Sequence, residues 1–337
     1  MIVSHSLGLV YIYLHICHAL LSHREVHTQL IIKHQSFFCL FLQPFAHSKH
    51  FDFTMKSAAI FSLVPAAAAF CHHGTNLYKR DQLFQRADGA FGFDALNGPL
   101  NWQSLTADNV ACAVGKNQSP INVQESNTKQ VQGSTITFTP EEHPYGATLE
   151  NLNGFLEVRA NGTMENGGLT YSLRQFHFHT PSEHRINGEH FPLEVHFVWE
   201  AEVGNGSSLA VVGFPIEVAE TSNPLLASVF KNIDQVTAVG SHAATGPLDF
   251  ASLADHLSKN IIYQYSGSLT TPPCTEAIAW NVVRTPIPID IATYLKAKSI
   301  MKYNARFTQN SPGEINLLEN AYQSLKKILG DNQGKSY

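Results

Sequence analysis

Two short segments with alternating side chains constrain the fold of this 337-residue chain more than any other feature. Residues 175–179 read QFHFH and residues 194–198 read EVHFV. Because successive side chains of a β-strand point to opposite faces, each segment would bury its aromatic residues on one face and present its histidines on the other. A connection containing Pro181, Gly188 and Pro192 suits a hairpin between them. The pattern therefore predicts two paired strands with one core face and one polar face.

Three histidines on the polar face, His177, His179 and His196, are candidate metal ligands. Strand pairing would place them about 5–7 Å apart at the backbone, so the imidazoles can converge on one ion. Three histidines without a thiolate leave a tetrahedral Zn²⁺ ion one protein ligand short, which is typical of a catalytic site. Gln175 and Glu194 each lie two residues from a histidine on the same face, where they can hold its second ring nitrogen. The alternative for a lone His-x-His pattern is a solvated strand face.

The chain from residue 81 to residue 330 reads as one domain of short β-type runs separated by glycine, asparagine and proline. Many strands and few helices predict a mainly β fold, with a large twisted, mostly antiparallel central sheet flanked by a few short helices. Helical spacing occurs at 224–236, after a Ser222 cap, and at 290–299 and 314–328. The strand-type runs are 134–139, 148–150, 155–159, 169–180, 193–201, 209–218 and 278–284.

The first 80 residues differ in composition from this domain. Met55 and Lys56 precede a short apolar run that ends in small residues, which is typical of a secretory signal peptide. Because a signal peptide acts from the N-terminus, we expect Met55 to be the true start. A membrane anchor near residues 7–21 is the alternative, which the histidines in that stretch and Arg24 argue against. The expected parts are a non-native extension 1–54, a signal peptide 55–70, a candidate pro-segment 71–80 and a polar tail 331–337.

Cysteines and sequons are consistent with export. Of five cysteines, three lie at or before the signal cleavage region. The remaining two, Cys112 and Cys274, are expected to pair, as two cysteines in a secreted domain usually do. Asn161 and Asn205 begin acceptor patterns for N-glycosylation. The sequence therefore predicts a secreted, extracellular protein without a stable membrane anchor. A net charge of −5 and the lack of a basic cluster argue against a nucleic-acid partner.

The histidine segments belong to a longer series of motifs that resembles the alpha-class carbonic anhydrases, in the bacterial, plant and fungal branch. The string SEH at 182–184 and the loop GSLTTPPCTE at 267–276 are similar to active-site motifs of that family. The resemblance also includes GPLNW at 98–102, QSPIN at 118–122 and NAR at 304–306, and so covers about 91–306. It implies reversible hydration of carbon dioxide to bicarbonate and a proton by zinc-bound hydroxide, in a monomer or homodimer.

The resemblance also implies a role for individual residues. Thr270 would accept a hydrogen bond from the hydroxide, and Glu183 would take the proton of the Thr270 hydroxyl. Gln175 would hold His177, Glu194 would hold His196, and a backbone carbonyl near Asn304 would hold His179. Carbon dioxide is apolar, so one wall of the site should be dry. The residues that match this substrate pocket are Val198, Val211, Leu269, Thr271, Ile278 and Trp280.

One feature of the fast members of this family is missing. They carry a histidine after an Asn-Gly-like turn, which passes protons to buffer. The corresponding stretch here, from Asn151 to Glu157, contains no histidine. Proton transfer would then depend on Glu157, on water chains or on another histidine such as His184. We therefore expect a lower and more buffer-dependent turnover.

Two rival functions are disfavoured by the same residues. A related binding protein without catalysis would typically lack one of the three zinc histidines, and all three are present. A zinc protease would carry two histidines at helical spacing in a His-Glu-x-x-His motif. His177 and His179 have strand spacing instead, so catalysis of carbon dioxide hydration is the preferred interpretation.

Overall fold

The computed structural model describes residues 91–204 and 206–333. The expected extension 1–54, signal peptide 55–70 and pro-segment 71–80 lie outside the described residues, as does most of the polar tail. In the described ranges, no helix is both long and apolar enough to cross a membrane.

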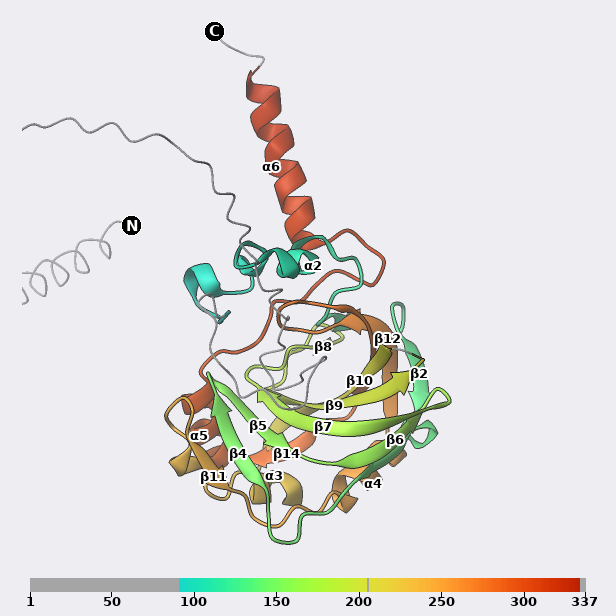
Figure 1. The fold of residues 1–337 in the computed structure, drawn as a ribbon, viewed down its shortest axis with the longest axis vertical. Helices are drawn as coiled ribbons and strands as arrows, with labels where there is room; N and C mark the ends of the chain where they lie inside the picture. Colours follow the sequence, from blue (N-terminus) through green and yellow to red (C-terminus); the bar gives the residue numbers. More distant parts are fainter. Residues whose placement is uncertain (1–90, 205, 334–337) are drawn as a thin grey trace, which may run out of the picture. The chain divides into compact units, whose positions relative to one another are not determined.

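One large mixed sheet dominates the described residues, as the mainly β pattern predicts (Figure 1). Its strands pair antiparallel except where β10 runs parallel to β13 and to β14. Along the sheet the order is β11 (His242–Ala244), β4 (Thr148–Leu152), β5 (Phe155–Arg159), β7 (Leu169–His179), β9 (Leu193–Val203), β10 (Gly206–Ala219), β13 (Glu276–Val283), β12 (Ile261–Ser268) and β2 (Lys129–Gln132). Three further strands pair with members of this series: β14 (Ile287–Asp290) pairs with β10, β6 (Gly162–Asn166) pairs with β7, and β3 (Thr137–Pro140) pairs with β6. A separate parallel pair joins β1 (Asn122–Val123) to β8 (Arg185–Ile186).

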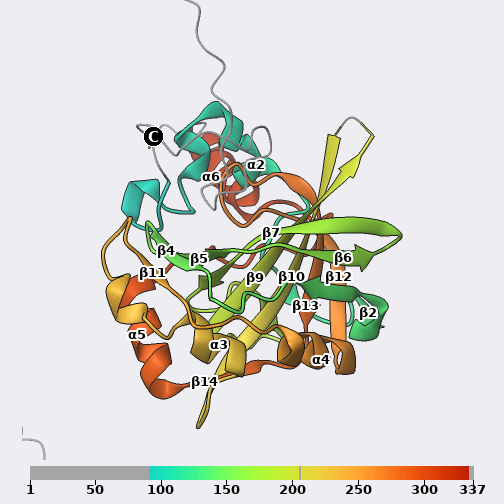
Figure 2. The same cartoon turned by 60° about the horizontal axis from the view of Figure 1, so that its bottom comes forward.

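Three helices pack on the core face of the sheet: α3 (Pro224–Val229), α4 (Ala251–Lys259) and α5 (Ile291–Met301). Figure 2 shows them gathered along one side of the strands. Phe176, Phe178 and Phe197 are fully buried in the same cluster as the apolar side chains of these helices. The phenylalanines of both alternating segments therefore face the core, which confirms the predicted orientation.

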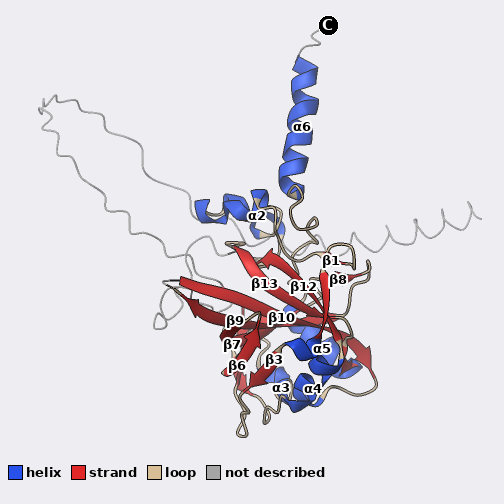
Figure 3. Cartoon of the chain, turned by 90° about the vertical axis from the view of Figure 1, so that its right-hand side faces the viewer, coloured by secondary structure: helices blue, strands red, loops and turns tan. Residues whose placement is uncertain are grey.

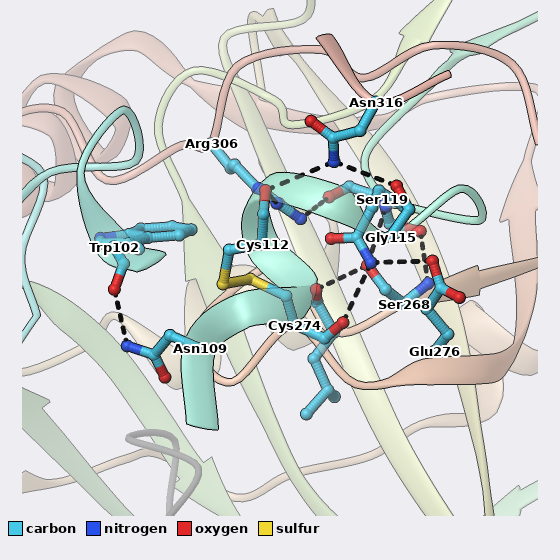
Figure 4. Close-up of a disulfide and its surroundings, with 12 residues drawn as sticks. Trp102, Asn109, Cys112, Gly115, Ser119, Ser268, Cys274, Glu276, Arg306 and Asn316 are labelled. Carbon is cyan, nitrogen blue, oxygen red and sulfur yellow. Dashed lines mark hydrogen bonds between the residues drawn. A yellow bond between two sulfur atoms is a disulfide. The ribbon is translucent and has the colours of Figure 1, made fainter. Parts of the chain in front are cut away.

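The opposite face carries the N-terminal part of the domain. Short helical turns η1 (Ala95–Asn97), η2 (Trp102–Ser104) and η3 (Ala107–Val110) lead into α2 (Ala111–Val114). Cys112 on α2 is disulfide-bonded to Cys274, which confirms the predicted pair (Figure 4). The bridge ties this segment to the loop between β12 and β13 that also carries Thr270.

The structure corrects two local predictions. The helix expected over 224–236 ends at Val229 and is followed by a separate 3-10 turn, η5 (Ile233–Gln235). Its cap is Asn223, whose side chain accepts a hydrogen bond from the backbone of Leu225, and not Ser222, which binds Asp290. The strand expected over 134–139 is shorter, β3 (Thr137–Pro140), and the 3-10 turn η4 (Gly133–Thr135) precedes it. The backbone N–H of Gly133 bonds to the carbonyl of Asn260, after α4.

The last helix, α6 (Leu317–Gln333), begins beside α2 and extends outward from the domain (Figure 3). Its first turn is anchored by Asn316, whose side chain donates to the carbonyls of Cys112 and Gly115. Beyond that turn its apolar side chains are exposed.

Candidate active site

The register of β7 and β9 brings the three predicted histidines together. His177 lies directly opposite His196 across the strand pair, and His179 is two residues further along β7. Ring centroids are 4.9 Å apart for His177 and His179, 5.4 Å for His177 and His196, and 4.6 Å for His179 and His196. All three side chains are buried, and one ring nitrogen of each lies within 4.8 Å of the others.

The second nitrogen of each imidazole is held by the partner that the sequence predicts. His177 Nδ1 lies 2.8 Å from Gln175 Oε1, and His179 Nδ1 lies 2.8 Å from the carbonyl oxygen of Asn304. Since both oxygens only accept hydrogen bonds, each Nδ1 donates, which fixes the tautomer and makes Nε2 the nitrogen that can bind a metal. In His196 the arrangement is reversed, because Nε2 lies 2.8 Å from Glu194 Oε1 and Nδ1 faces the other histidines.

These residues fit a zinc ion. Burial, together with the neighbouring His196, lowers the pKa of His179 to about 3, and burial lowers the pKa of His196. Both rings are therefore neutral, and neutral imidazole is the form that coordinates metals. The nitrogens that converge are Nε2 of His177, Nε2 of His179 and Nδ1 of His196, and no thiolate is among them. That donor set suits Zn²⁺ with one coordination position left for a non-protein ligand.

Glu183 lies beside the histidines, with Oε2 3.5 Å from His179 Nε2. Its other oxygen accepts a hydrogen bond of 2.8 Å from the backbone N–H of Arg306. Burial raises the pKa of this carboxyl, while the Arg306 N–H and the Thr270 hydroxyl lower it. Oε2 has no partner of normal hydrogen-bond geometry in the described chain. The Thr270 hydroxyl thus lies close enough to the Glu183 carboxyl group to act on its pKa.

An apolar cluster adjoins the histidines on the other side. Val198, Val211 and Trp280 occupy facing positions on three neighbouring strands, because Val211 is in register with both of the others. The Trp280 ring packs against His196, with centroids 4.9 Å apart, and its indole N–H donates to the carbonyl of Ser268. All five apolar residues expected in the substrate pocket fall in this one cluster: Val198, Val211, Leu269, Ile278 and Trp280.

Comparisons with known proteins agree with this geometry. Residues 97–327 match the family model of eukaryotic-type carbonic anhydrases. The chain belongs to the eukaryotic-type carbonic anhydrase family. The solved fungal alpha carbonic anhydrase from Aspergillus oryzae is 46% identical, covers 69% of this chain and 98% of its own, and superposes with a TM-score of 0.65. The Thermovibrio ammonificans alpha carbonic anhydrase, solved with sulfanilamide, is 29% identical over 67% and 98% of the two chains, with a TM-score of 0.60. A carbonic anhydrase of Pectobacterium atrosepticum is 33% identical over 67% of this chain and 89% of its own.

In this carbonic anhydrase fold, Glu194 also holds His184, which the sequence indicates only as a candidate for proton transfer. Glu194 accepts from the backbone N–H of His184 at 2.8 Å and lies 2.7 Å from its Nδ1. His184 Nε2 lies 2.6 Å from the Tyr265 hydroxyl, which is 2.8 Å from Ser119 Oγ. Although burial acts to raise it, His184 and His196 hold the pKa of Glu194 well below its usual range. Both nitrogens of His184 are therefore engaged, Nδ1 with Glu194 and Nε2 with Tyr265. The SEH string at 182–184 was the sequence signal for His184, but its partner Tyr265 lies 81 residues further along the chain.

Glu157 is the remaining acidic residue next to the ligands. It lies on β5, directly opposite His177 on β7, and is buried. Neither carboxylate oxygen has a hydrogen-bond partner in the described residues. Burial raises the pKa of Glu157, with a smaller opposing effect of Arg159. A neutral carboxyl group beside the metal ligands is the form that this environment favours.

The structure also places two further predicted residues, Thr271 and Asn161. Thr271 is buried, and its hydroxyl has no hydrogen-bond partner in the described ranges. Asn161 is exposed after β5, where a glycan can be attached. The second sequon, at Asn205, lies outside the described residues.

Proposed function

We propose that this chain is a zinc carbonic anhydrase that interconverts carbon dioxide and bicarbonate outside the cell. The observation that carries the proposal is the group of three buried imidazoles, each fixed through its second ring nitrogen. Membership of the family supports the activity, and the retention of all three histidines supports catalysis over simple binding.

His177, His179 and His196 would hold the ion. When bound, Zn²⁺ would supply the charge that lowers the pKa of a water to about 7, the general value for carbonic anhydrases, and so would provide the nucleophile for carbon dioxide. The charge of the bound ion would favour Glu183 as a carboxylate. A carboxylate only accepts hydrogen bonds, so Glu183 would accept one from the Thr270 hydroxyl. The Thr270 oxygen is then free to accept a hydrogen bond. It would orient a hydroxyl group at the reaction site by accepting the hydrogen bond that this group donates.

The apolar cluster gives carbon dioxide a dry place beside the histidines. Val198, Val211 and Trp280 offer no hydrogen-bonding group toward one another, so water gains little there and an apolar linear molecule is favoured. Leu269 and Ile278 extend the same surface. A larger side chain at Val211 would occupy the substrate position.

The proton leaves by a slow route. No histidine lies between Asn151 and Glu157, and His184 is engaged at both nitrogens. The release of a proton from a group of pKa 7 to bulk water is unfavourable by about seven pK units, which corresponds to a free energy of roughly 9–10 kcal/mol. External buffer therefore limits the maximal turnover, and raising imidazole concentration should increase it strongly.

Export and glycosylation belong to the same proposal. The Cys112–Cys274 bridge supports residence in an oxidising compartment outside the cytoplasm, because disulfides persist there. Secretion with a signal peptide at 55–70 and a glycan on Asn161 would follow. N-terminal sequencing and intact-mass measurement of protein from the medium, before and after removal of N-glycans, test both.

The activity is tested on purified protein by stopped-flow hydration of carbon dioxide together with zinc analysis. His196→Ala should lose stoichiometric zinc and hydration. The matched control is His242→Ala, because His242 is exposed on the edge strand β11. Full activity and full zinc content in His196→Ala would overturn the assignment.

A further inference from the structure

Helix α6 carries an apolar stripe that the described domain leaves exposed. Tyr322 is 59% exposed, Leu325 55%, Ile328 59% and Leu329 58%. Contiguous apolar surface of this kind is uncommon on a solvated helix, and it marks an interaction site. Isolated helices of this length are marginally stable in water, so a partner on the stripe would also stabilise the helix.

The spacing of the stripe identifies the kind of partner. Leu318, Tyr322, Leu325 and Leu329 follow one another at intervals of four, three and four residues. This is the narrow seam of a helix that pairs with one other helix, since broader stripes face a globular core. Ala321 and Ile328 border the seam on one flank, and Glu319 and Lys326 border it on the other.

The seam is complementary to itself when a second copy runs antiparallel. Leu318 then meets Leu329 of the partner, and Tyr322 meets Leu325 of the partner, in four successive layers. On one flank Glu319 lies between the same layers as Lys326 of the partner, and this pair occurs twice by symmetry. In a parallel pair each Glu319 would lie at the same level as the other Glu319 instead. A membrane surface would favour a more basic polar face than one with Glu319, Lys326 and Lys327.

The position of α6 leaves room for this pairing. Beyond its first turn the helix extends away from the sheet (Figures 1 and 3). Val114, on α2 close to the first turn of α6, is also exposed.

We propose that α6 is the dimerisation element of this protein and that two copies associate through an antiparallel pair of α6 helices. The pair buries Tyr322, Leu325 and Leu329 of both copies, and it covers the remaining surface of Leu318, which is half-buried in the single chain. The two active sites remain independent, because no residue of the histidine site lies on α6.

The test is sedimentation velocity of the full secreted protein over a concentration series, with the mass of one chain measured by mass spectrometry. The wild type should sediment with twice that mass, and Leu325→Glu should sediment as a single chain with unchanged hydration activity. The control Asn320→Glu adds the same charge on the opposite side of α6 and should remain dimeric. Glu319→Lys should raise the dissociation constant roughly tenfold, and adding Lys326→Glu should restore it.

Three results would overturn the proposal. The first is a wild type that is a single chain at every concentration. The second is a dimer that survives Leu325→Glu, because the interface would then lie elsewhere. The third is a monomeric wild type that co-sediments with phosphatidylserine vesicles through Leu325, which would assign the stripe to a lipid surface. Hydration activity is measured separately, so none of these results bears on the proposed catalysis.

Discussion

Loss of the Cys112–Cys274 bridge should cost this domain a large part of its stability. The bridge joins residues that are 162 positions apart in the chain. In the chain-entropy description, closing a loop of this length in the unfolded state contributes about 5 kcal/mol at 25 °C. Whole domains are stable by only about 5–15 kcal/mol. We expect the double variant Cys112→Ala/Cys274→Ala to lose roughly 2–5 kcal/mol.

The assay is equilibrium urea unfolding followed by tryptophan fluorescence, because Trp102 is buried in the same small cluster as the two cysteines. Each single variant already removes the cross-link, so the two singles and the double should lose nearly equal free energy. That non-additivity distinguishes the cross-link from side-chain packing, which would add between sites.

A second consequence concerns the catalytic loop. The backbone N–H of Cys274 donates to the carbonyl of Thr271, and Leu269 donates to the carbonyl of Thr275. Without the bridge these turns are held by hydrogen bonds alone, so Thr270 should become more mobile and hydration should fall even where the variant is folded. A double variant within about 1 kcal/mol of the wild type would refute the loop-entropy reasoning.

Three further predictions follow from the site. Burial raises the pKa of Glu157 above the usual 4.5, so the free energy of unfolding of the wild type should fall as pH rises above about 4.5. Glu157→Gln should lack this loss, and at pH 8 it should unfold at a higher urea concentration than the wild type when both are measured without zinc. Equal pH profiles would contradict this. Val211→Phe should lower kcat/KM for hydration by at least roughly tenfold while zinc content stays at one per chain; unchanged kcat/KM would remove Val211 from the substrate wall. Phe155→His should weaken the dependence of turnover on buffer, because this ring lies 5.7 Å from His179. Undiminished buffer dependence in a folded, zinc-loaded variant would count against it.

The sequence alone was sufficient for the strands that carry the ligands. Alternation in 175–179 and 194–198 predicts which side chains share a face, and the structure has the phenylalanines in the core and the histidines together. The second-nitrogen partners Gln175 and Glu194 were predictable for the same reason, since they lie two residues from their histidines on one strand.

Contacts between distant segments were not predictable from such patterns. The carbonyl of Asn304 reaches His179 across 125 residues, and only the family resemblance pointed to it. Tyr265 reaches His184 across 81 residues, and nothing in the local sequence indicates that pair. Helix α4 was missed because Leu253 and Leu257 supply only two buried positions in a nine-residue helix.

The direct pairing of His177 with His196 makes metal binding a check on the assembly of the sheet. A shift of one residue between β7 and β9 would turn every side chain of the shifted strand to the other face. His177 and His179 would then point into the helix-covered core, and Phe176 and Phe178 would replace them beside His196. Only the chain with the correct register can bind the ion with three nitrogens. Zinc binding therefore stabilises only molecules in which β7 and β9 pair in the native register, and it shifts the folding equilibrium toward them. The same three residues that serve the reaction thus also select the native alignment of the two central strands.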